Sequence, residues 1–272
     1  MERIEKYFII LFAINIFIAI ILLIISHDAA DVEITKFSSK VLHFNFNGET
    51  YDWEKQIIYD LSENGNNGLL FGSPAWIKFE GPKNDGAFEF DGVDDKIFVN
   101  HVPGLSPSTT RNFTIVFWIK FKTTVFADNQ DKGYINFLGK AGLNNYEFLF
   151  RQYNTSNSQR RPNRISFYLF NLEGGLGSGA YFQEPINTNE WIFITALYDG
   201  ENIELWKDAI LKQRVSVHQY NVMPNIGYAP LKIGTIDDKT FFSGYIDELQ
   251  IYNRTLTQQE IINLYNFNYN VV

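Results

Sequence analysis

The sequence contains no cysteine and only four histidines among its 272 residues. The absence of cysteine excludes a disulfide scaffold, a thiolate metal site and a cysteine nucleophile. There is also no histidine cluster and no Gly-x-Ser-x-Gly motif, so zinc chemistry and serine nucleophilic catalysis lack a candidate residue. The fold must therefore be stabilised by burial, with a hard cation as the remaining inorganic contribution.

Basic residues are also scarce. Lys and Arg number 23 against 31 Asp and Glu, which gives a formal net charge of -8. A chain with this balance has no basic surface to neutralise a phosphate backbone, so we expect no nucleic-acid partner. Hydrophobic residues make up 45% of the chain and aromatic residues 17%, a composition that is sufficient for a packed core and unlike that of a disordered protein.

One long apolar run stands near the start of the chain. Residues 7–25 are 19 consecutive residues of which only Asn15 is polar, and a helix of this length crosses a hydrocarbon core of ~30 Å. A cleaved signal peptide has a shorter apolar region followed by a cleavage site between small residues, whereas His27 and Asp28 follow here. We expect residues 1–27 to form an uncleaved transmembrane anchor in contact with membrane lipid.

The basic residues around this run predict its orientation. Arg3 and Lys6 directly precede the apolar run, and the next basic residues, Lys36 and Lys40, lie further beyond it. This bias favours a cytoplasmic N-terminus and an extracellular remainder, as in a single-pass protein of the cell membrane. An external domain without cysteine is more typical of prokaryotic surface proteins than of small animal modules.

The rest of the chain has the pattern of an all-β domain. Residues 28–40 are polar and without periodicity, so we expect a short stalk there and one domain over residues 41–272. Short alternating runs follow, bounded by Gly, Asn, Asp and Pro; in residues 113–121 the large apolar side chains alternate with a two-residue period. About a dozen such strands exceed what one sheet holds comfortably, which predicts two packed sheets.

The end of the chain is different. Thr257 and Glu260 form a capping box, in which each side chain satisfies a backbone donor at the start of a helix. We expect a short helix to about Asn266, with an apolar stripe of Ile261, Leu264 and Tyr265 that closes one edge or end of the sandwich.

Five motifs occur in the order known from one family: YDLSENGNNGLL (59–70), GAFEFDGVDDKIFV (86–99), FTIVFWIK (113–120), EWIFITALYDGENIELWKDA (190–209) and LKIGTIDDKTFFSGYIDELQIYNRTLTQQEIINLY (231–265). On these motifs, residues 41–266 resemble the laminin G-like, concanavalin A-like jellyroll domains. The resemblance implies a jellyroll of two antiparallel sheets of six or seven strands, with a concave sheet or loop rim that often binds carbohydrate. One departure is Asp208-Ala209, where the family usually has Asp-Gly at a hairpin.

The same resemblance implies a structural calcium ion. In similar domains the first loop and the acidic residue of the final strand hold the ion, which here correspond to Asp60, Asn64, Asn67 and Asp247. These residues supply the oxygen ligands that calcium needs. The alternative is that the Asn residues of this loop are turn formers and that Asp247 bonds a backbone amide.

A catalytic carboxylate pair is missing from the final strand. Glycoside hydrolysis needs two carboxylates that flank the scissile bond, and the polysaccharide-cleaving relatives present Glu-x-Asp-x-x-Glu from one strand. Here Tyr245 stands in place of the first Glu, and Asp247 and Glu248 are adjacent, so they are expected on opposite faces of a strand. We therefore predict a protein that is not an enzyme and has no catalytic residues.

Sugar recognition by a sandwich combines aromatic faces with a few directional polar groups. Five residues on predicted strands or turns could reach a shared groove in this way: Trp118, Arg151, Tyr168, Asn171 and Tyr181. Most aromatic rings must nevertheless be packing, since the chain has 25 Phe, 15 Tyr and 5 Trp. The long polar segment 153–163 is either a recognition tip on the rigid scaffold or a solvated hairpin end.

Three hypotheses for function remain. The first is a membrane-anchored extracellular protein whose jellyroll domain binds glycan or another cell-surface ligand in adhesion or recognition. The second is a structural surface or filament subunit that forms a homo-oligomer through its N-terminal helix. The third, and least favoured by the missing carboxylate pair, is a glycoside hydrolase.

Overall fold

The computed structural model describes residues 39–108, 110–126, 133–157 and 159–269. The described residues fall almost wholly in one compact unit, Lys40–Val272, and the fold below is that of this unit. The anchor predicted for residues 1–27 and nearly all of the stalk predicted for residues 28–40 lie outside the described residues. Within the described ranges, no helix has both the length and the apolar character needed to cross a membrane.

Eight strands of the described chain form the first sheet: β1 (Lys40–Phe44), β5 (Ala75–Ile77), β6 (Ala87–Asp91), β8 (Phe113–Phe121), β13 (Trp191–Tyr198), β14 (Asn202–Lys207), β15 (Ile210–Ser216) and β17 (Ser243–Tyr252). Their order is β15-β14-β13-β8-β17-β6-β5, and β1 also pairs with β17. All of these pairings are antiparallel. The long strands β8 and β17 therefore lie beside each other at the centre, although the sequence separates them by more than a hundred residues.

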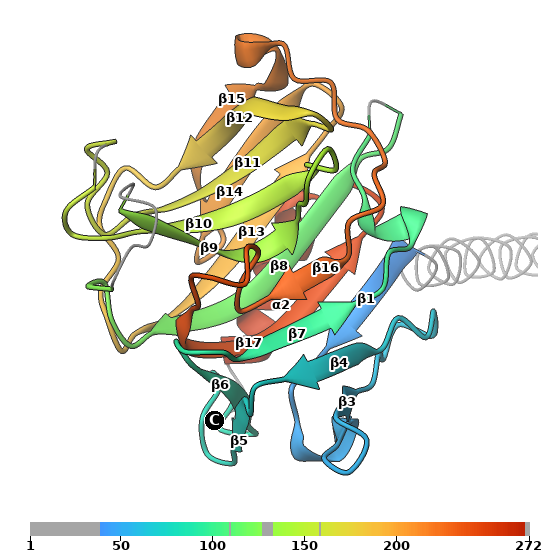
Figure 1. Ribbon diagram of the computed structural model, residues 1–272, viewed down its shortest axis with the longest axis vertical. Helices are drawn as coiled ribbons and strands as arrows, with labels where there is room; N and C mark the ends of the chain where they lie inside the picture. The colour runs from blue at the N-terminus through green and yellow to red at the C-terminus, as the bar shows by residue number, and fades with distance from the viewer. Residues whose placement is uncertain (1–38, 109, 127–132, 158, 270–272) are drawn as a thin grey trace, which may run out of the picture. The chain divides into compact units, whose positions relative to one another are not determined.

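Nine described strands form the second sheet: β2 (Tyr51–Asp52), β3 (Ile57–Ile58), β4 (Gly68–Phe71), β7 (Lys96–Val99), β9 (Tyr134–Lys140), β10 (Phe148–Tyr153), β11 (Ile165–Asn171), β12 (Gly174–Tyr181) and β16 (Leu231–Ile233). Their order is β12-β11-β10-β9-β16-β7-β4-β3-β2, and the ladder from β12 to β9 can be followed in Figure 1. Short 3-10 turns η1 (Gly48–Thr50), η2 (Pro103–Leu105) and η3 (Val217–Tyr220) and a helix α2 (Gln258–Tyr269) complete the described elements.

The alternation predicted for residues 113–121 is confirmed in β8. Phe113, Ile115, Phe117, Ile119 and Phe121 are all fully buried in one large apolar cluster between the sheets. Rings from the two sheets interlock there, because Phe117 of the first sheet meets Phe150 of the second edge to face at a centroid distance of 5.0 Å. Burial of these side chains, each worth roughly 1.5–3 kcal/mol, is what holds the sandwich together.

The opposite face of β8 is covered by α2. Trp118 packs in a second cluster with Phe193 and Ile261, and its ring stacks on that of Tyr265 at 5.6 Å. The sequence therefore predicts the helix and its apolar stripe correctly, but the stripe covers an outer face of the first sheet and not an edge or end of the sandwich.

The predicted capping box is also confirmed. The Thr257 hydroxyl accepts from the Glu260 backbone N–H at 3.3 Å, and the Glu260 carboxylate accepts from the Thr257 N–H at 2.9 Å. Arg254 adds an ion pair to Glu260 at 2.7 Å. The helix runs three residues beyond the predicted end, to Tyr269.

The β14–β15 hairpin contains the departure from the family pattern. Asp208 and Ala209 both have positive φ, 53° and 58°. Ala209 thus occupies a left-handed position that favours glycine, which costs roughly 1–2 kcal/mol but leaves the hairpin formed. The predicted fold class, an all-β sandwich of two antiparallel sheets with a short C-terminal helix, is confirmed.

Candidate functional site

A pocket of about 550 Å³ lies on the outer face of the second sheet, where β9 to β12 approach β15 and η3. The outer face follows from strand alternation: Phe150 and Phe167 face the core, whereas their neighbours Arg151 and Tyr168 line the pocket. Its size is within the usual range for a small-molecule site, roughly 300–1,000 Å³.

The floor of the pocket depends on glycines in β12. Gly177 and Gly179 lie opposite the aromatic side chains of β11, and a Cβ added to either would fall 2.5 Å from the Phe170 ring or 2.3 Å from the Tyr168 ring. These two rings therefore lie against bare backbone. The glycine-rich sequence of β12 is what lets two aromatic rings lie flat along this edge of the sheet.

A hydrogen-bonded network of two tyrosine hydroxyls and one guanidinium group lies beside these rings. The hydroxyls of Tyr153 and Tyr168 are 3.0 Å apart, and Arg161 donates to both of them. Burial raises the pKa of Tyr168 to about 12, so its hydroxyl stays protonated at neutral pH. Tyr168 thus keeps both donor and acceptor capacity.

Two arginines are held in place by aromatic faces. The Arg151 guanidinium carbon lies 3.8 Å from the centre of the Tyr134 ring and 4.9 Å from that of Tyr168. The Arg161 guanidinium carbon lies 4.0 Å from the centre of the Tyr181 ring. Cation–π contacts of this kind orient the guanidinium groups toward the pocket without neutralising them.

Amide side chains add directional groups to the wall. Gln159, Gln213 and Gln219 line the pocket, and the Gln213 side chain is fixed because its Oε1 accepts from the Tyr181 backbone N–H at 2.7 Å. A pyranose ring is bound by flat aromatic rings that contact its apolar face and by convergent polar groups that bind its hydroxyls. The amide, hydroxyl and guanidinium groups of this pocket are polar groups of that kind.

Three of the five residues predicted to contact sugar meet in this pocket, namely Arg151, Tyr168 and Tyr181. The prediction for Trp118 is wrong. Trp118 belongs to the first sheet, its side chain is 1% exposed, and the Tyr265 ring of α2 stacks on it. Asn171 does not line the pocket either. Its amide accepts from the Met223 N–H at 2.9 Å and donates to the Asn221 carbonyl at 3.4 Å, so it fixes the segment after η3.

The sequence analysis did not select Tyr134, Arg161 or Gln213. Arg161 belongs to the segment 153–163, which the sequence predicts to be either a recognition tip or a solvated hairpin end. Two residues of this segment, Gln159 and Arg161, line the pocket. Alternation along β9 would have placed Tyr134 on the outer face. No local signal marks Gln213, because it reaches the site only through the approach of β15 to β12.

Three of the four predicted calcium ligands, Asp60, Asn64 and Asn67, form hydrogen bonds with the backbone of their loop and of β1. The Asp60 carboxylate accepts from the backbone N–H groups of His43, Ser62 and Asn66, each at 2.9 Å. Asn67 accepts from the Asp60 N–H at 2.9 Å, and Asn64 donates to the Lys40 carbonyl at 3.0 Å. In this loop the turn-forming alternative describes what the side chains do.

Asp247, the fourth predicted ligand, lies among other oxygens. Its carboxylate is fully buried, and within the described residues its Oδ2 atom has no hydrogen-bond partner; the same holds for Oδ1 of Asp85 and Oδ1 of Asn47. Asn47 Nδ2 lies 3.4 Å from Asp85 Oδ2. A Cβ added at Gly81 would fall 2.8 Å from Asp247 Oδ2 and 2.7 Å from the Gly86 carbonyl oxygen, so these two oxygens face the same spot.

The pKa of Asp247 also indicates a cluster of buried acidic groups. Burial raises the pKa of Asp247 well above its usual range, and the charges of Glu248 and Asp85 add to this effect. Buried carboxylate and amide oxygens without donors, beside a backbone carbonyl, are groups that a hard cation satisfies. The residues present therefore fit calcium, with Asn47 and Asp85 in place of the first-loop residues.

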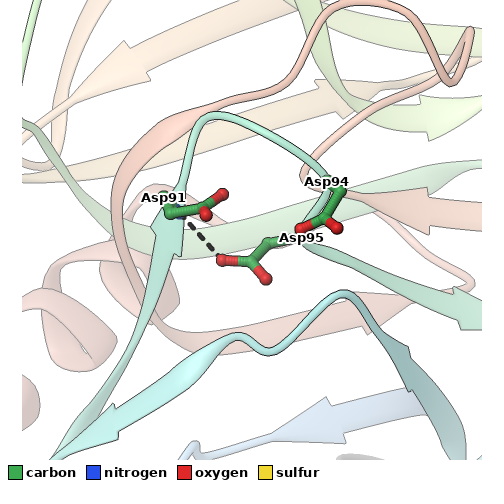
Figure 2. Close-up of side chains that lie close together, drawn as sticks. All are labelled: Asp91, Asp94 and Asp95. Atoms are coloured by element: carbon green, nitrogen blue, oxygen red, sulfur yellow. Dashed lines mark hydrogen bonds between the residues drawn. The ribbon is translucent and has the colours of Figure 1, made fainter.

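A further acidic group lies at the turn between β6 and β7. Figure 2 shows Asp91, Asp94 and Asp95 around this turn, with the Asp95 carboxylate directed at the Asp91 backbone. Asp95 is buried and accepts from the N–H groups of Ser73 at 2.7 Å and Asp91 at 2.8 Å. The Asp95 carboxylate thus closes the turn, which is a structural role.

The adjacent residues Asp247 and Glu248 of β17 do not follow the regular two-residue alternation of a strand. Glu248 has a φ of 50° at a β-bulge, and it pairs with Lys83 at 2.6 Å and His43 at 3.3 Å. Asp247 and Glu248 are 0% and 5% exposed. Both are therefore out of reach of a polysaccharide chain.

The family model of the concanavalin A-like lectin/glucanases superfamily matches residues 91–262. No curated protein matches the chain by sequence.

Similar solved structures are binding domains of clostridial toxins. The binding domain of Paraclostridial Mosquitocidal Protein 1 superposes with a TM-score of 0.63 at 17% identity, covering 86% of this chain and 53% of its own. The botulinum neurotoxin serotype G binding domain gives 0.64 at 16% identity, with coverages of 84% and 51%. The serotype D ligand binding domain in complex with N-acetylneuraminic acid gives 0.61 at 18% identity, with coverages of 85% and 51%. The chain spans about half the length of these structures, and the likeness is one of fold.

Proposed function

Because the chain belongs to the concanavalin A-like lectin/glucanases superfamily, we propose that its sandwich is a non-catalytic module that binds carbohydrate in the pocket on β9 to β12. The observation that carries this proposal is the pocket itself. It combines the Tyr168 and Phe170 rings with convergent arginine and glutamine side chains in one cavity. The N-acetylneuraminic acid bound to the serotype D domain supports a carbohydrate ligand for a chain of this fold.

We further propose that this module acts outside the cell at a membrane surface. The support is the sequence of residues 1–27, in which a long apolar run follows Arg3 and Lys6. In this account the N-terminal segment holds the protein to the cell, and the pocket provides recognition of a glycan or another surface ligand.

A broad glycan array probed with the purified full chain tests the proposed binding. We expect selective binding, and Tyr181→Ala should weaken it about tenfold, because removal of an aromatic face costs about 1.5 kcal/mol. Tyr228→Ala is the matched control, because Tyr228 is 80% exposed and does not line the pocket. If the folded chain binds no glycan, the structural-subunit hypothesis with helix-mediated assembly takes its place.

We also propose that one structural calcium ion is held by Asn47, Asp85 and Asp247. A cation there would neutralise the buried Asp247 and half-buried Asp85 carboxylates and occupy oxygens that the described residues leave without donors. The ion stabilises the fold and takes no part in sugar contact.

Thermal unfolding of the full chain in calcium and in chelator tests this assignment. We expect calcium to raise the Tm by several degrees, because saturating ligand at about 100 times Kd contributes about 2.7 kcal/mol. Asp247→Asn should abolish the calcium-dependent shift. Asp60→Asn should lower the Tm but keep the shift, since the Asp60 carboxylate binds backbone N–H groups of β1 and of its own loop. Loss of the shift in Asp60→Asn alone would return the site to the first loop.

A further inference from the structure

The pocket is basic although the protein is acidic. The chain has a formal net charge of -8, yet the residues that line the pocket include two arginines and no aspartate or glutamate. Within the described ranges, neither Arg151 nor Arg161 forms an ion pair. Arg214 and Arg254, in contrast, each pair with a carboxylate at 3.0 Å or less.

Both guanidinium groups keep donors free for a ligand. Arg151 uses Nε to donate to Asn136 at 3.1 Å, and Arg161 uses Nη1 for the hydroxyls of Tyr153 and Tyr168. In the part of the chain that the structure describes, the two Nη atoms of Arg151 and Nη2 of Arg161 make no hydrogen bond. An arginine fork with free N–H groups matches a carboxylate in a bidentate manner.

The two arginines meet at one ring. Arg151 lies over the face of Tyr168 at 4.9 Å, and Arg161 donates to the hydroxyl of the same residue. An anion bound beside Tyr168 is therefore within reach of both cations, which lie in a half-buried site where charge–charge attraction is stronger than in open solvent. Cation–π contacts alone would hold the side chains in place but would leave their N–H groups without acceptors.

We infer that the pocket selects sugars that carry a carboxylate, the chemistry of uronic and sialic acids, over their neutral counterparts. This inference rests on the proposed carbohydrate-binding function. The sugar ring lies beside Tyr168 and Tyr181, and its carboxylate accepts hydrogen bonds from Arg151 and Arg161.

Two matched ligand pairs test the selection by calorimetric titration of the full chain. Methyl glucuronoside and methyl glucoside differ only at C6, and N-acetylneuraminic acid differs from its methyl ester only at the carboxyl group, where the ester replaces the charge by a methyl group. We expect each acid to bind at least tenfold more tightly than its neutral partner in 50 mM NaCl. The preference should shrink in 500 mM NaCl, because salt screens a partly exposed charge pair.

Variants localise the effect. Arg151→Gln and Arg161→Gln should each weaken binding of the acids about tenfold and binding of their neutral partners by clearly less. Arg160→Gln is the matched control, because Arg160 is the exposed neighbour of Arg161 and does not line the pocket. It removes the same charge and should change affinity less than twofold. Arg161→Lys separates an effect on folding from an effect on recognition. Lysine keeps the positive charge but lacks the planar pair of N–H donors that binds a carboxylate in a bidentate manner.

The outcomes are distinguishable. Equal affinity for acid and neutral partners overturns this inference and leaves the proposed function in place. An Arg160→Gln effect as large as that of Arg161→Gln also overturns it, because the preference would then come from general charge. No binding of any glycan, acidic or neutral, by the folded chain ends both proposals.

Discussion

Lys140 and Glu147 form an ion pair whose side chains are both 0% exposed, with Nζ and Oε1 3.2 Å apart. Burial lowers the pKa of Lys140 and raises the pKa of Glu147, while the opposite charge of the partner counteracts each shift. We expect Glu147→Gln to destabilise the fold by about 3–5 kcal/mol, because it leaves a buried ammonium unpaired. The double variant Lys140→Met with Glu147→Leu should be far milder. Urea unfolding of these two variants and of the unmodified chain checks this, and equal costs for the single and double changes would contradict it.

Gly179 controls the floor of the pocket. A Cβ there would fall 2.3 Å from the Tyr168 ring and 2.6 Å from the Phe167 carbonyl oxygen, so Gly179→Ala should cost about 1–3 kcal/mol in stability. Because Tyr168 must move, glycan affinity should fall as well. Gly142→Ala serves as control, since a Cβ there meets nothing within 4 Å. Unchanged glycan binding by Gly179→Ala would show that the ring position does not matter for recognition.

At the scale of elements, the start of α2 should respond to acid. The hydrogen bond and charge of Arg254 lower the pKa of Glu260 to about 2, with further help from the Thr257 N–H. A carboxylate with a depressed folded pKa contributes stability above its ordinary value near 4.5, and this contribution is lost as pH falls toward 2.

We therefore expect Glu260→Gln to cost 1 kcal/mol or less at pH 7, about the worth of a partly exposed pair. The variant should also lose less stability than the unmodified chain between pH 5 and pH 2. Chemical denaturation at both ends of that range measures the difference. Glu173→Gln, at an exposed position between β11 and β12, should leave the pH profile unchanged; a matching change in that control would point to net charge instead of the cap.

Elements were predictable where their signals are local. Side-chain alternation in residues 113–121 and the capping box at Thr257 depend on neighbours within a few positions, and both are confirmed. Strand order depends on pairings such as β8 with β17, which join distant segments. Periodicity does not determine that order, and the resemblance implied sheets of six or seven strands where the described chain has eight and nine.

At the scale of the whole molecule, the limits of sequence analysis appear at the sites. Periodicity places Trp118 and Tyr168 alike on a second strand face, but only the docking of α2 decides that the first is buried. Similarly, Asn47, Asp85 and Asp247 come from three separate segments, so their unpartnered oxygens are visible only in the folded chain. Arg151, Tyr168 and Tyr181 were predictable because adjacent outer-face residues of neighbouring strands must meet.

The distribution of charge also belongs to this scale. An acidic protein repels an acidic glycan at long range, so recognition has to come from the local field of Arg151 and Arg161 within about one Debye length, roughly 8 Å at physiological salt. Association with an acidic glycan is therefore expected to be slow at low ionic strength relative to a basic lectin, with selectivity expressed mainly in the dissociation rate.

The most direct measurement is a crystal structure of the full chain with the tightest ligand from the glycan array. We predict that the sugar ring lies in the pocket on β9 to β12, against Tyr168 and Tyr181, with its carboxylate between Arg151 and Arg161. A glycan bound on any other surface, with this pocket filled only by solvent, would contradict the account.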